Sequence, residues 1–214
     1  PAPGKNFTKT FEPADTGPTE QQLPCLFTDR NWASQDLGPA APVLAAFDEL
    51  PTQTLQLQED PLVQLQWAVD EQNQTLYGLL SVEAEGWIAI GFHNPGGEGM
   101  LDADIIQGTF VAEDLQEGKV YATQAMWSTT YGEPTVKPGI PGVPHAGLTA
   151  CGTYQTEGTT YLSFGRPLEY PAAYGPNYAN ITAGPNNMIY AFGSSNAFQY
   201  HGPNRGTRSV TWFS

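Results

Sequence analysis

Basic residues are scarce in this sequence. Only 8 of the 214 residues are Lys or Arg, against 22 Asp or Glu, so the formal net charge is -14 at pH 7. A chain this poor in cations cannot neutralise many phosphate groups, which excludes nucleic acid and anionic membrane surfaces as expected partners. Charged residues make up only 14% of the chain, so the imbalance reflects missing cations more than abundant acids. The expected protein partner therefore has a cationic docking face.

Long apolar runs and clustered cysteines are also absent. No segment approaches the roughly 18 consecutive apolar residues of a membrane helix, so we expect no membrane insertion. The two cysteines, Cys25 and Cys151, are far apart, and no CxxC or CxxCH motif is present. A four-cysteine zinc site and covalently attached c-type haem are therefore both excluded. The pair forms either two free thiols or a disulfide, and we expect the disulfide.

Glycosylation sequons indicate the compartment in which that disulfide would form. Three Asn-x-Ser/Thr sites occur, at Asn6, Asn73 and Asn180. Together with the paired cysteines and the high Gly and Pro content they favour a secreted, extracellular glycoprotein. Closing so long a loop with a disulfide contributes about 4–5 kcal/mol in the chain-entropy model.

Motifs of hydrolytic enzymes are missing. The sequence contains no GxSxG, HExxH or P-loop motif. Asp102 and Asp104 would share one face of a strand, but binding a turn amide or water suits them better than paired-carboxylate catalysis. Three histidines without clustered carboxylates are a poor zinc signature, and His145 lies in a Pro/Gly-rich loop where a solvated role is expected. Catalysis by this chain alone is therefore not the leading hypothesis.

Alternating hydrophobicity predicts an all-β fold. In residues 61–69, Val63, Leu65 and Trp67 alternate with glutamines, as in a half-buried strand. Short strands at regular spacing with turn residues between them are typical of an antiparallel sandwich or barrel. Residues 1–54 predict an extended N-terminal segment packed on a single domain over residues 55–214, with a short helix or strand at 41–50. Further strands are expected at 75–83, 86–92, 103–110, 119–127, 159–168, 187–193 and 207–213.

A glycine-rich turn carries one conspicuous methionine. The stretch GWIAIGFHNPGGEGMLDADIIQGTF predicts a strand, a loop with glycines at 96, 97 and 99, and a second strand, with Met100 at the loop's exit. A thioether and an imidazole on opposite sides of an iron are the axial ligands of some cytochromes, and His201 could supply the imidazole. Spacing alone leaves open that Met100 only packs under the loop, or that His93 is the second ligand.

The same stretch, followed far downstream by YHGPNRGTRSVTW, resembles a DOMON domain over roughly residues 55–214. The resemblance extends to the b-type cytochrome domain of cellobiose dehydrogenase and related DOMON cytochromes. It implies an immunoglobulin-like antiparallel β-sandwich. It also implies that haem b is bound between Met100 and His201, the positions of the family's methionine and histidine. The DADI spelling resembles the monooxygenase-associated branch of the family, of which some members bind no haem.

Several aromatic and basic residues are candidates for the expected haem pocket. Trp87, Phe92 and Tyr190 are candidate walls, with Trp67, Ile90 and Phe192 as further candidates, although most could be plain core. Arg205 and Arg208 follow His201 and could pair with the propionates.

Two functions follow from the resemblance. The first is an extracellular electron-transfer domain that passes single electrons between a reductant or flavin dehydrogenase and a redox partner such as a copper monooxygenase. The alternative is a non-redox module that binds carbohydrate or another ligand within a larger secreted protein.

Overall fold

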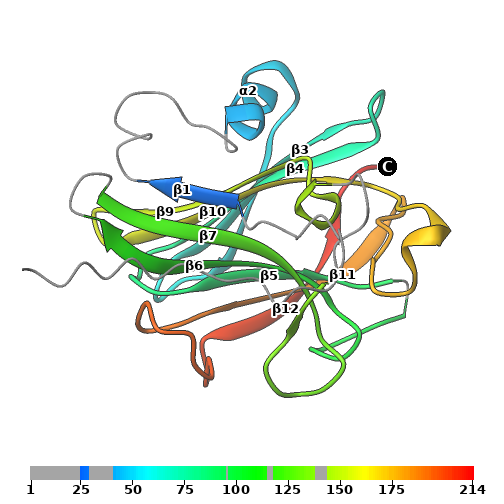
Figure 1. The fold of residues 1–214 in the computed structure, drawn as a ribbon. Helices are drawn as coiled ribbons and strands as arrows, with labels where there is room; N and C mark the ends of the chain where they lie inside the picture. Colours follow the sequence, from blue (N-terminus) through cyan, green and yellow to red (C-terminus); the bar gives the residue numbers. More distant parts are fainter. Residues whose placement is uncertain (1–24, 29–40, 95, 115–117, 138–143) are drawn as a thin grey trace, which may run out of the picture.

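The computed structural model describes residues 25–28, 41–94, 96–114, 118–137 and 144–214. These residues form two antiparallel β-sheets packed face to face (Figure 1). One short helix, α2 (Ala41–Glu49), lies outside the sandwich and buries Val43 and Ala46. The expected all-β sandwich is thus confirmed. No helix in the described part of the chain is long and apolar enough to cross a bilayer.

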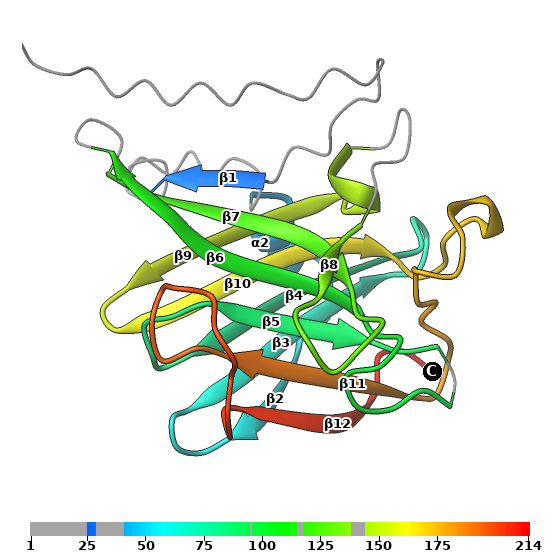
Figure 2. The ribbon, with the colours of Figure 1, turned by 60° about the horizontal axis from the view of Figure 1, so that its bottom comes forward.

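The larger sheet, here called sheet A, has seven strands. Its strands follow the order β1-β7-β6-β5-β11-β12, and the short β8 pairs with β7 (Figure 2). Every pairing within it is antiparallel. The strands are β1 (Cys25–Thr28), β5 (Ile88–Phe92), β6 (Asp104–Asp114), β7 (Gly118–Trp127), β8 (Thr135–Val136), β11 (Pro185–Phe192) and β12 (Arg205–Thr211).

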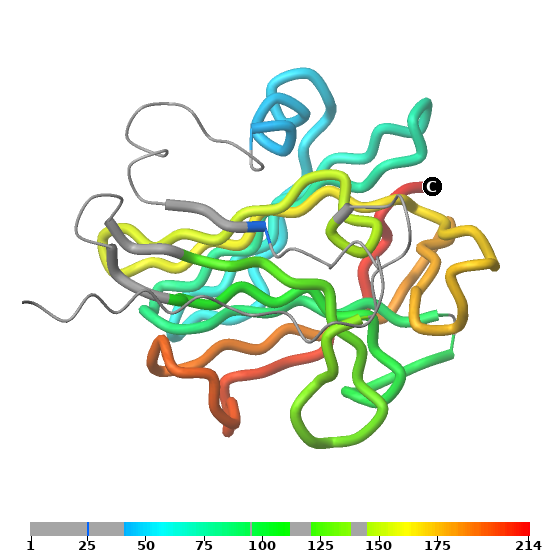
Figure 3. Tube along the Cα trace, in the orientation of Figure 1, coloured from blue at the N-terminus to red at the C-terminus, as the bar shows by residue number. Residues whose placement is uncertain are grey.

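The smaller sheet, sheet B, has the order β2-β3-β4-β10-β9. The predicted boundary between residues 54 and 55 falls within its first strand, and α2 contacts β3, β4, β9 and β10 (Figure 3). Two 3-10 turns, η2 (Pro144–Gly147) and η3 (Ala172–Tyr174), lie in the connections. The strands are β2 (Gln53–Gln58), β3 (Val63–Asp70), β4 (Thr75–Val82), β9 (Ala150–Thr156) and β10 (Thr159–Pro167).

The core between the sheets follows from the alternation of side chains along each strand. In β3, the buried residues Val63, Leu65 and Trp67 alternate with half-buried glutamines, as the sequence predicts. Every residue of β5 is buried, however, which means that both faces of this strand are covered. A second, smaller apolar cluster lies on the outer face of sheet A and includes Trp87, Ala89 and Ile105.

The predicted disulfide is confirmed and joins the two sheets. Cys25 lies on β1, the edge strand of sheet A, and Cys151 lies on β9, the edge strand of sheet B. Both residues are almost fully buried, at 1% and 0% exposure. The bond therefore ties the edge strand β1 of sheet A to the edge strand β9 of sheet B.

A second buried feature is a cluster of three charged side chains, Asp104, Lys137 and Arg166. The Asp104 carboxylate accepts a hydrogen bond from Lys137 Nζ at 2.5 Å and lies 3.4 Å from the Arg166 guanidinium. The backbone N–H of Ala179 donates to the same carboxylate at 3.0 Å. All three charged side chains are at most 3% exposed. Asp104 is thus a structural anion rather than half of an acid pair with Asp102, which is exposed.

Aromatic rings complete the surroundings of this cluster. Lys137 Nζ lies 3.7 Å from the centre of the Tyr178 ring, and the Arg166 guanidinium lies 4.5 Å from the Phe92 ring. Burial lowers the pKa of Lys137 to about 8, and the neighbouring Asp104 offsets only part of that effect. Burial also raises the pKa of Tyr178 to about 12.

The balance of charge in the cluster predicts an order of stabilities. Asp104→Asn leaves two buried cations without a carboxylate, and we expect it to lower the free energy of unfolding by about 3–5 kcal/mol. Lys137→Met leaves one anion and one cation, Asp104 and Arg166, and should cost less. Urea unfolding of the two variants measures this order. An Asp104→Asn variant that is more stable than Lys137→Met would contradict it.

The lowered pKa of Lys137 predicts a dependence of stability on pH. An unfolded lysine keeps its proton up to a pKa of about 10.5, whereas Lys137 in the folded chain loses it near pH 8. The unfolded state therefore binds more protons between these values, so the contribution of Lys137 to the free energy of unfolding rises with pH. The stability difference between wild type and Lys137→Met should shift in favour of wild type from pH 7.5 to pH 9.5. A difference that stays flat, or shifts the other way, contradicts the assignment.

Candidate functional site

A cavity of about 790 Å³ opens on the outer face of sheet A. Its volume lies within the roughly 300–1,000 Å³ that is usual for small-molecule and cofactor sites. The floor is built from two rows of residues that lie directly opposite one another on four neighbouring strands, β6, β5, β11 and β12. The first row is Ile105, Gly91, Ile189 and Thr207, and the second is Gln107, Ala89, Ala191 and Arg205.

Small residues in these rows leave space above the sheet. A Cβ atom on Gly91 would lie 2.6 Å from Ile189 Cγ1 and 3.3 Å from Ile105 Cγ1, so the two isoleucines meet above this glycine. Ala89 and Ala191 continue the floor without long side chains. The result is a broad and mainly apolar floor, suited to a flat apolar group.

Met100 and His201 both line this cavity, and they reach it from opposite ends of the floor. Met100 belongs to the loop that follows Phe92 at the end of β5. His201 belongs to the loop between β11 and β12, which begins where Phe192 pairs with Ile88 at the start of β5. Figure 2 shows these two loops at opposite ends of the strands. The fold thus presents a thioether and an imidazole to one space from two sides.

The hydrogen bonding of His201 leaves one ring nitrogen available. Its Nδ1 lies 3.0 Å from the carbonyl oxygen of Gly202, so the Nδ1–H tautomer donates there. In that tautomer Nε2 carries a lone pair and has no proton. A histidine that binds a metal through one nitrogen commonly donates from the other in this way.

Aromatic side chains surround the His201 end of the cavity. Trp87 is 3% exposed, and its ring centre lies 5.0 Å from that of Phe198 and 6.5 Å from that of His201. The indole Nε1–H of Trp87 has no hydrogen-bond partner among the described residues. Tyr200 packs on His201 with ring centres 4.6 Å apart, and its hydroxyl accepts a hydrogen bond from Arg205 at 3.1 Å.

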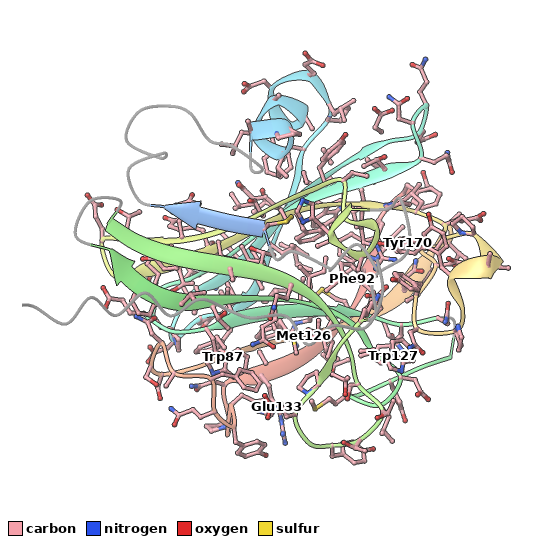
Figure 4. All side chains as sticks on the ribbon, in the orientation of Figure 1. Trp87, Phe92, Met126, Trp127, Glu133 and Tyr170 are labelled. Carbon is pink, nitrogen blue, oxygen red and sulfur yellow. A yellow bond between two sulfur atoms is a disulfide. The ribbon has the colours of Figure 1, made fainter. Side chains whose placement is uncertain are left out.

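Another wall of the cavity is formed by the connection between β7 and β8. Tyr131, Gly132, Glu133 and Pro134 line the cavity from this connection, which projects beyond the sheet (Figure 3). Tyr131 and Tyr200 are each 73% exposed, which is high for such large side chains. Figure 4 shows Glu133 and Trp87 on the same side of the molecule. The mouth of the cavity therefore exposes aromatic surface.

Most of the residues predicted for the pocket are brought together. Met100, His201, Arg205, Trp87 and Tyr190 all line the cavity. The Tyr190 ring, however, belongs to the core between the sheets, and its hydroxyl donates to the carbonyl oxygen of Leu57 at 3.3 Å.

Phe92 and Arg208 lie elsewhere. Phe92 is not among the residues that line the cavity, because its side chain points into the core, where it packs against Phe164 and the Arg166 guanidinium (Figure 4). Arg208 lies opposite Met188 on β12, and its guanidinium bonds to the carbonyl oxygen of Leu57. Of the two arginines, Arg205 alone lines the cavity. Trp67, Ile90 and Phe192 belong to the inner core, and only Ile90 also borders the cavity.

The remaining histidines do not line the cavity. His93 is buried at 2% exposure and contacts the carbonyl oxygen of Gly99. His145 lies near Cys25 and Cys151, with its donor nitrogen and both sulfur atoms within 4.8 Å of one another. The two sulfurs are bonded to each other, so this group is a disulfide with a histidine beside it rather than a metal centre.

Comparison with known protein families shows the family to which this chain belongs. A family model described as DOMON domain matches residues 59–193, which is more than half of the sequence. The chain belongs to the DOMON domain family. The match includes Met100 and the loop that carries it. The match ends before His201 and β12. The role expected for His201 is therefore supported by its place at the cavity and by the downstream motif YHGPNRGTRSVTW.

DOMON domains can bind haem, and the residues around this cavity suit that group. The centre of the floor is apolar, because Ile189 and Ile105 lie beside Gly91 there. The donor set pairs a thioether with an imidazole whose Nε2 is unprotonated. Arg205, which is exposed, offers a donor for an acidic group at the periphery. The chemistry of these residues is therefore compatible with a haem group.

One feature of the sequence indicates the cavity floor, namely the uniformly apolar strand β5. In the stretch IAIGF, both the odd and the even positions of β5 are apolar or small. This pattern indicates a strand that is covered on both faces. A strand of a two-sheet sandwich usually has one polar face, so an apolar outer face needs a ligand or another layer to cover it. The wall residues Tyr131, Phe198 and Tyr200 come from loops, where no periodic signal exists.

Proposed function

We propose that this DOMON domain binds haem b between Met100 and His201 and transfers single electrons. The observation that supports the proposal most strongly is the approach of these two side chains to one apolar cavity from opposite ends of its floor. Bound haem would supply the one-electron chemistry through its iron. Thioether and imidazole ligation raises an iron's reduction potential, which suits an electron carrier.

The protein's own residues would define that chemistry. Met100 and His201 would hold the haem iron through a thioether and an imidazole. His201 would be held by its Nδ1–H hydrogen bond to Gly202. Trp87 and Ile189 would exclude water from one face, and Arg205 would neutralise an acidic substituent. Such a domain transfers electrons and needs a separate catalytic partner.

The partner and the compartment are part of the same proposal. Among the four Lys and Arg side chains whose exposure the structure describes, Arg205 and Arg208 are exposed, whereas Lys137 and Arg166 are buried. The acidic surface favours a cationic docking face on a redox partner, such as a flavin dehydrogenase or a copper monooxygenase. The confirmed disulfide supports an extracellular location.

The sequons remain predictions of glycosylation. Asn73 lies in the exposed turn between β3 and β4, where it is accessible to modification. Asn180 is half-buried, and its amide oxygen accepts a hydrogen bond from the Tyr170 N–H at 2.9 Å. Asn6 lies outside the described residues.

A second candidate function rests on the exposed rings at the cavity mouth. Tyr131, Phe198 and Tyr200 form an aromatic edge that could stack on a sugar, as in a carbohydrate-binding module. This alternative does not explain why a thioether and an imidazole meet at the same cavity. We therefore rank it second.

Haem titration with matched variants tests the first proposal. Wild type should bind haemin and give a low-spin spectrum with sharp reduced α and β bands. His201→Ala should weaken binding by more than the roughly 10–100-fold that loss of a partner outside the coordination shell costs. Met100→Leu should remove the weak charge-transfer band of the ferric state and lower the potential.

The chain supplies a control for each ligand. Met126 lies in the apolar cluster on the outer face of sheet A but does not line the cavity, and His145 lies beside the disulfide. Met126→Leu and His145→Ala should bind haemin as wild type does. A wild-type protein that stays colourless with haemin, but binds oligosaccharides, overturns the proposal in favour of the second candidate.

Surface charge predicts a dependence on salt. With a net charge of -14, the rate of electron transfer from the reduced domain to a cationic acceptor protein should fall as ionic strength rises. A neutral small-molecule acceptor serves as the control and should show little change. Equal and flat rates for both acceptors would count against docking through the acidic surface.

A further inference from the structure

The loop that carries Met100 is held at several points, although three of its residues are glycines. Gly97 N–H donates to the Asn94 carbonyl oxygen, and Asn187 Nδ2 donates to the Gly97 carbonyl oxygen, both at 3.0 Å. Beyond the methionine, the N–H of Asp102 donates to the Ser128 carbonyl oxygen at 2.8 Å. Both ends of the loop are thus fastened to neighbouring strands and loops.

His93 contacts the backbone directly before Met100, in addition to the hydrogen bond that the Ala103 N–H donates to the Met100 carbonyl oxygen at 3.4 Å. Its Nε2 lies 2.8 Å from the carbonyl oxygen of Gly99, which is half of the peptide bond that leads into Met100. A carbonyl only accepts, so Nε2 carries the proton and donates. The other ring nitrogen, Nδ1, is buried and has no partner among the described residues. The imidazole of His93 therefore makes one hydrogen bond, to the Gly99 carbonyl oxygen. That bond fixes the plane of the Gly99–Met100 peptide.

The surroundings of His93 hold the ring in that orientation. A Cβ on Gly97 would lie 2.8 Å from His93 Nδ1 and 3.1 Å from His93 Cβ, so the loop backbone closes directly over the imidazole. The ring is 2% exposed, which prevents water from replacing the bond to Gly99. Gly99 itself has φ +68, a left-handed conformation that needs a glycine, and nothing lies within 4 Å of its Cβ position. The His93 bond to the Gly99 carbonyl oxygen therefore holds the backbone at a residue whose conformation suits glycine.

We propose that His93 is a positioning residue for Met100: its Nε2–H holds the Gly99–Met100 peptide so that the thioether faces the cavity. The proposal rests on haem binding as the function of the cavity, but its geometric part concerns the protein without haem. His93 would act on the methionine side alone, since His201 is held by its own bond to Gly202. A thioether is a weak ligand, so a loop that presents it in advance favours its binding to iron.

The protein without haem provides the first test. NMR of ¹⁵N-labelled imidazole rings should show His93 as the Nε2–H tautomer, with slow exchange of that proton with solvent. In His93→Gln the amide nitrogen reaches near the Nε2 position, whereas in His93→Asn it ends near Nδ1. Amide exchange at Gly99 and Met100 should therefore stay close to wild type in His93→Gln and speed up in His93→Asn. An Nδ1–H tautomer in wild type overturns the proposal even if no variant folds.

The haem-loaded protein provides the second test, with exogenous imidazole as a competitor for the methionine position. His93→Asn should let imidazole displace Met100 at concentrations about 10–100-fold lower than in wild type, with haem affinity through His201 largely kept. His93→Gln should restore most of the wild-type value. His145→Asn, in which a histidine distant from the cavity changes, is the control and should behave as wild type.

The two tests separate the two claims. If wild type takes up no haem, the proposed function fails, and the exchange experiment alone decides whether His93 anchors the loop. If haem binds but imidazole displaces Met100 equally in wild type, His93→Gln and His93→Asn, the positioning role is overturned and the function stands. Loss of all haem binding in both His93 variants, with Met100→Leu still binding, would make His93 a ligand and also overturn the proposal.

Discussion

The cavity depends on the register of four antiparallel strands. Because β6, β5, β11 and β12 pair without a slip at this point, Ile105, Gly91, Ile189 and Thr207 form one straight row across sheet A. A shift of one residue in any pairing would exchange the inner and outer faces of that strand. It would place core residues such as Ile90 and Tyr190 on the outer face and bury the floor. The floor of the candidate site is thus formed by the pairing of the strands, whichever ligand the site binds.

The loops at the two ends of this floor differ in how they are fixed. The Met100 loop is fastened by His93 and Asn187, and the strand that follows it begins at Asp104, the centre of the buried charge cluster. The His201 loop is tied to Trp87 through two backbone hydrogen bonds, from Trp87 N–H to Ser195 and from Gly193 N–H to Trp87. Both ligand candidates therefore rest on fixed backbone, so each can be presented to the cavity without ordering a free loop.

Sequence reasoning predicted much of this arrangement but not all of it. Period-two patterns located β3 and the inner faces, and the glycine turn located Met100. Strand β9 was missed because it follows a Pro/Gly-rich stretch and has no alternation: its first six residues are buried on both faces. The Asp104, Lys137 and Arg166 cluster joins three distant segments, which no local pattern reports. The aromatic type of Phe92 does not reveal which face of its strand it occupies, so the sequence alone does not show that this ring lies in the core.

X-ray absorption at the iron edge of the haem-loaded ferric protein tests the central claim most directly. The account predicts one sulfur and five nitrogens in the first coordination shell, with the sulfur lost in Met100→Leu and retained in Met126→Leu. A shell of nitrogen and oxygen atoms alone in the wild-type protein would show that Met100 does not bind the iron. That result would contradict the account, since the approach of thioether and imidazole from opposite ends of one floor is its foundation.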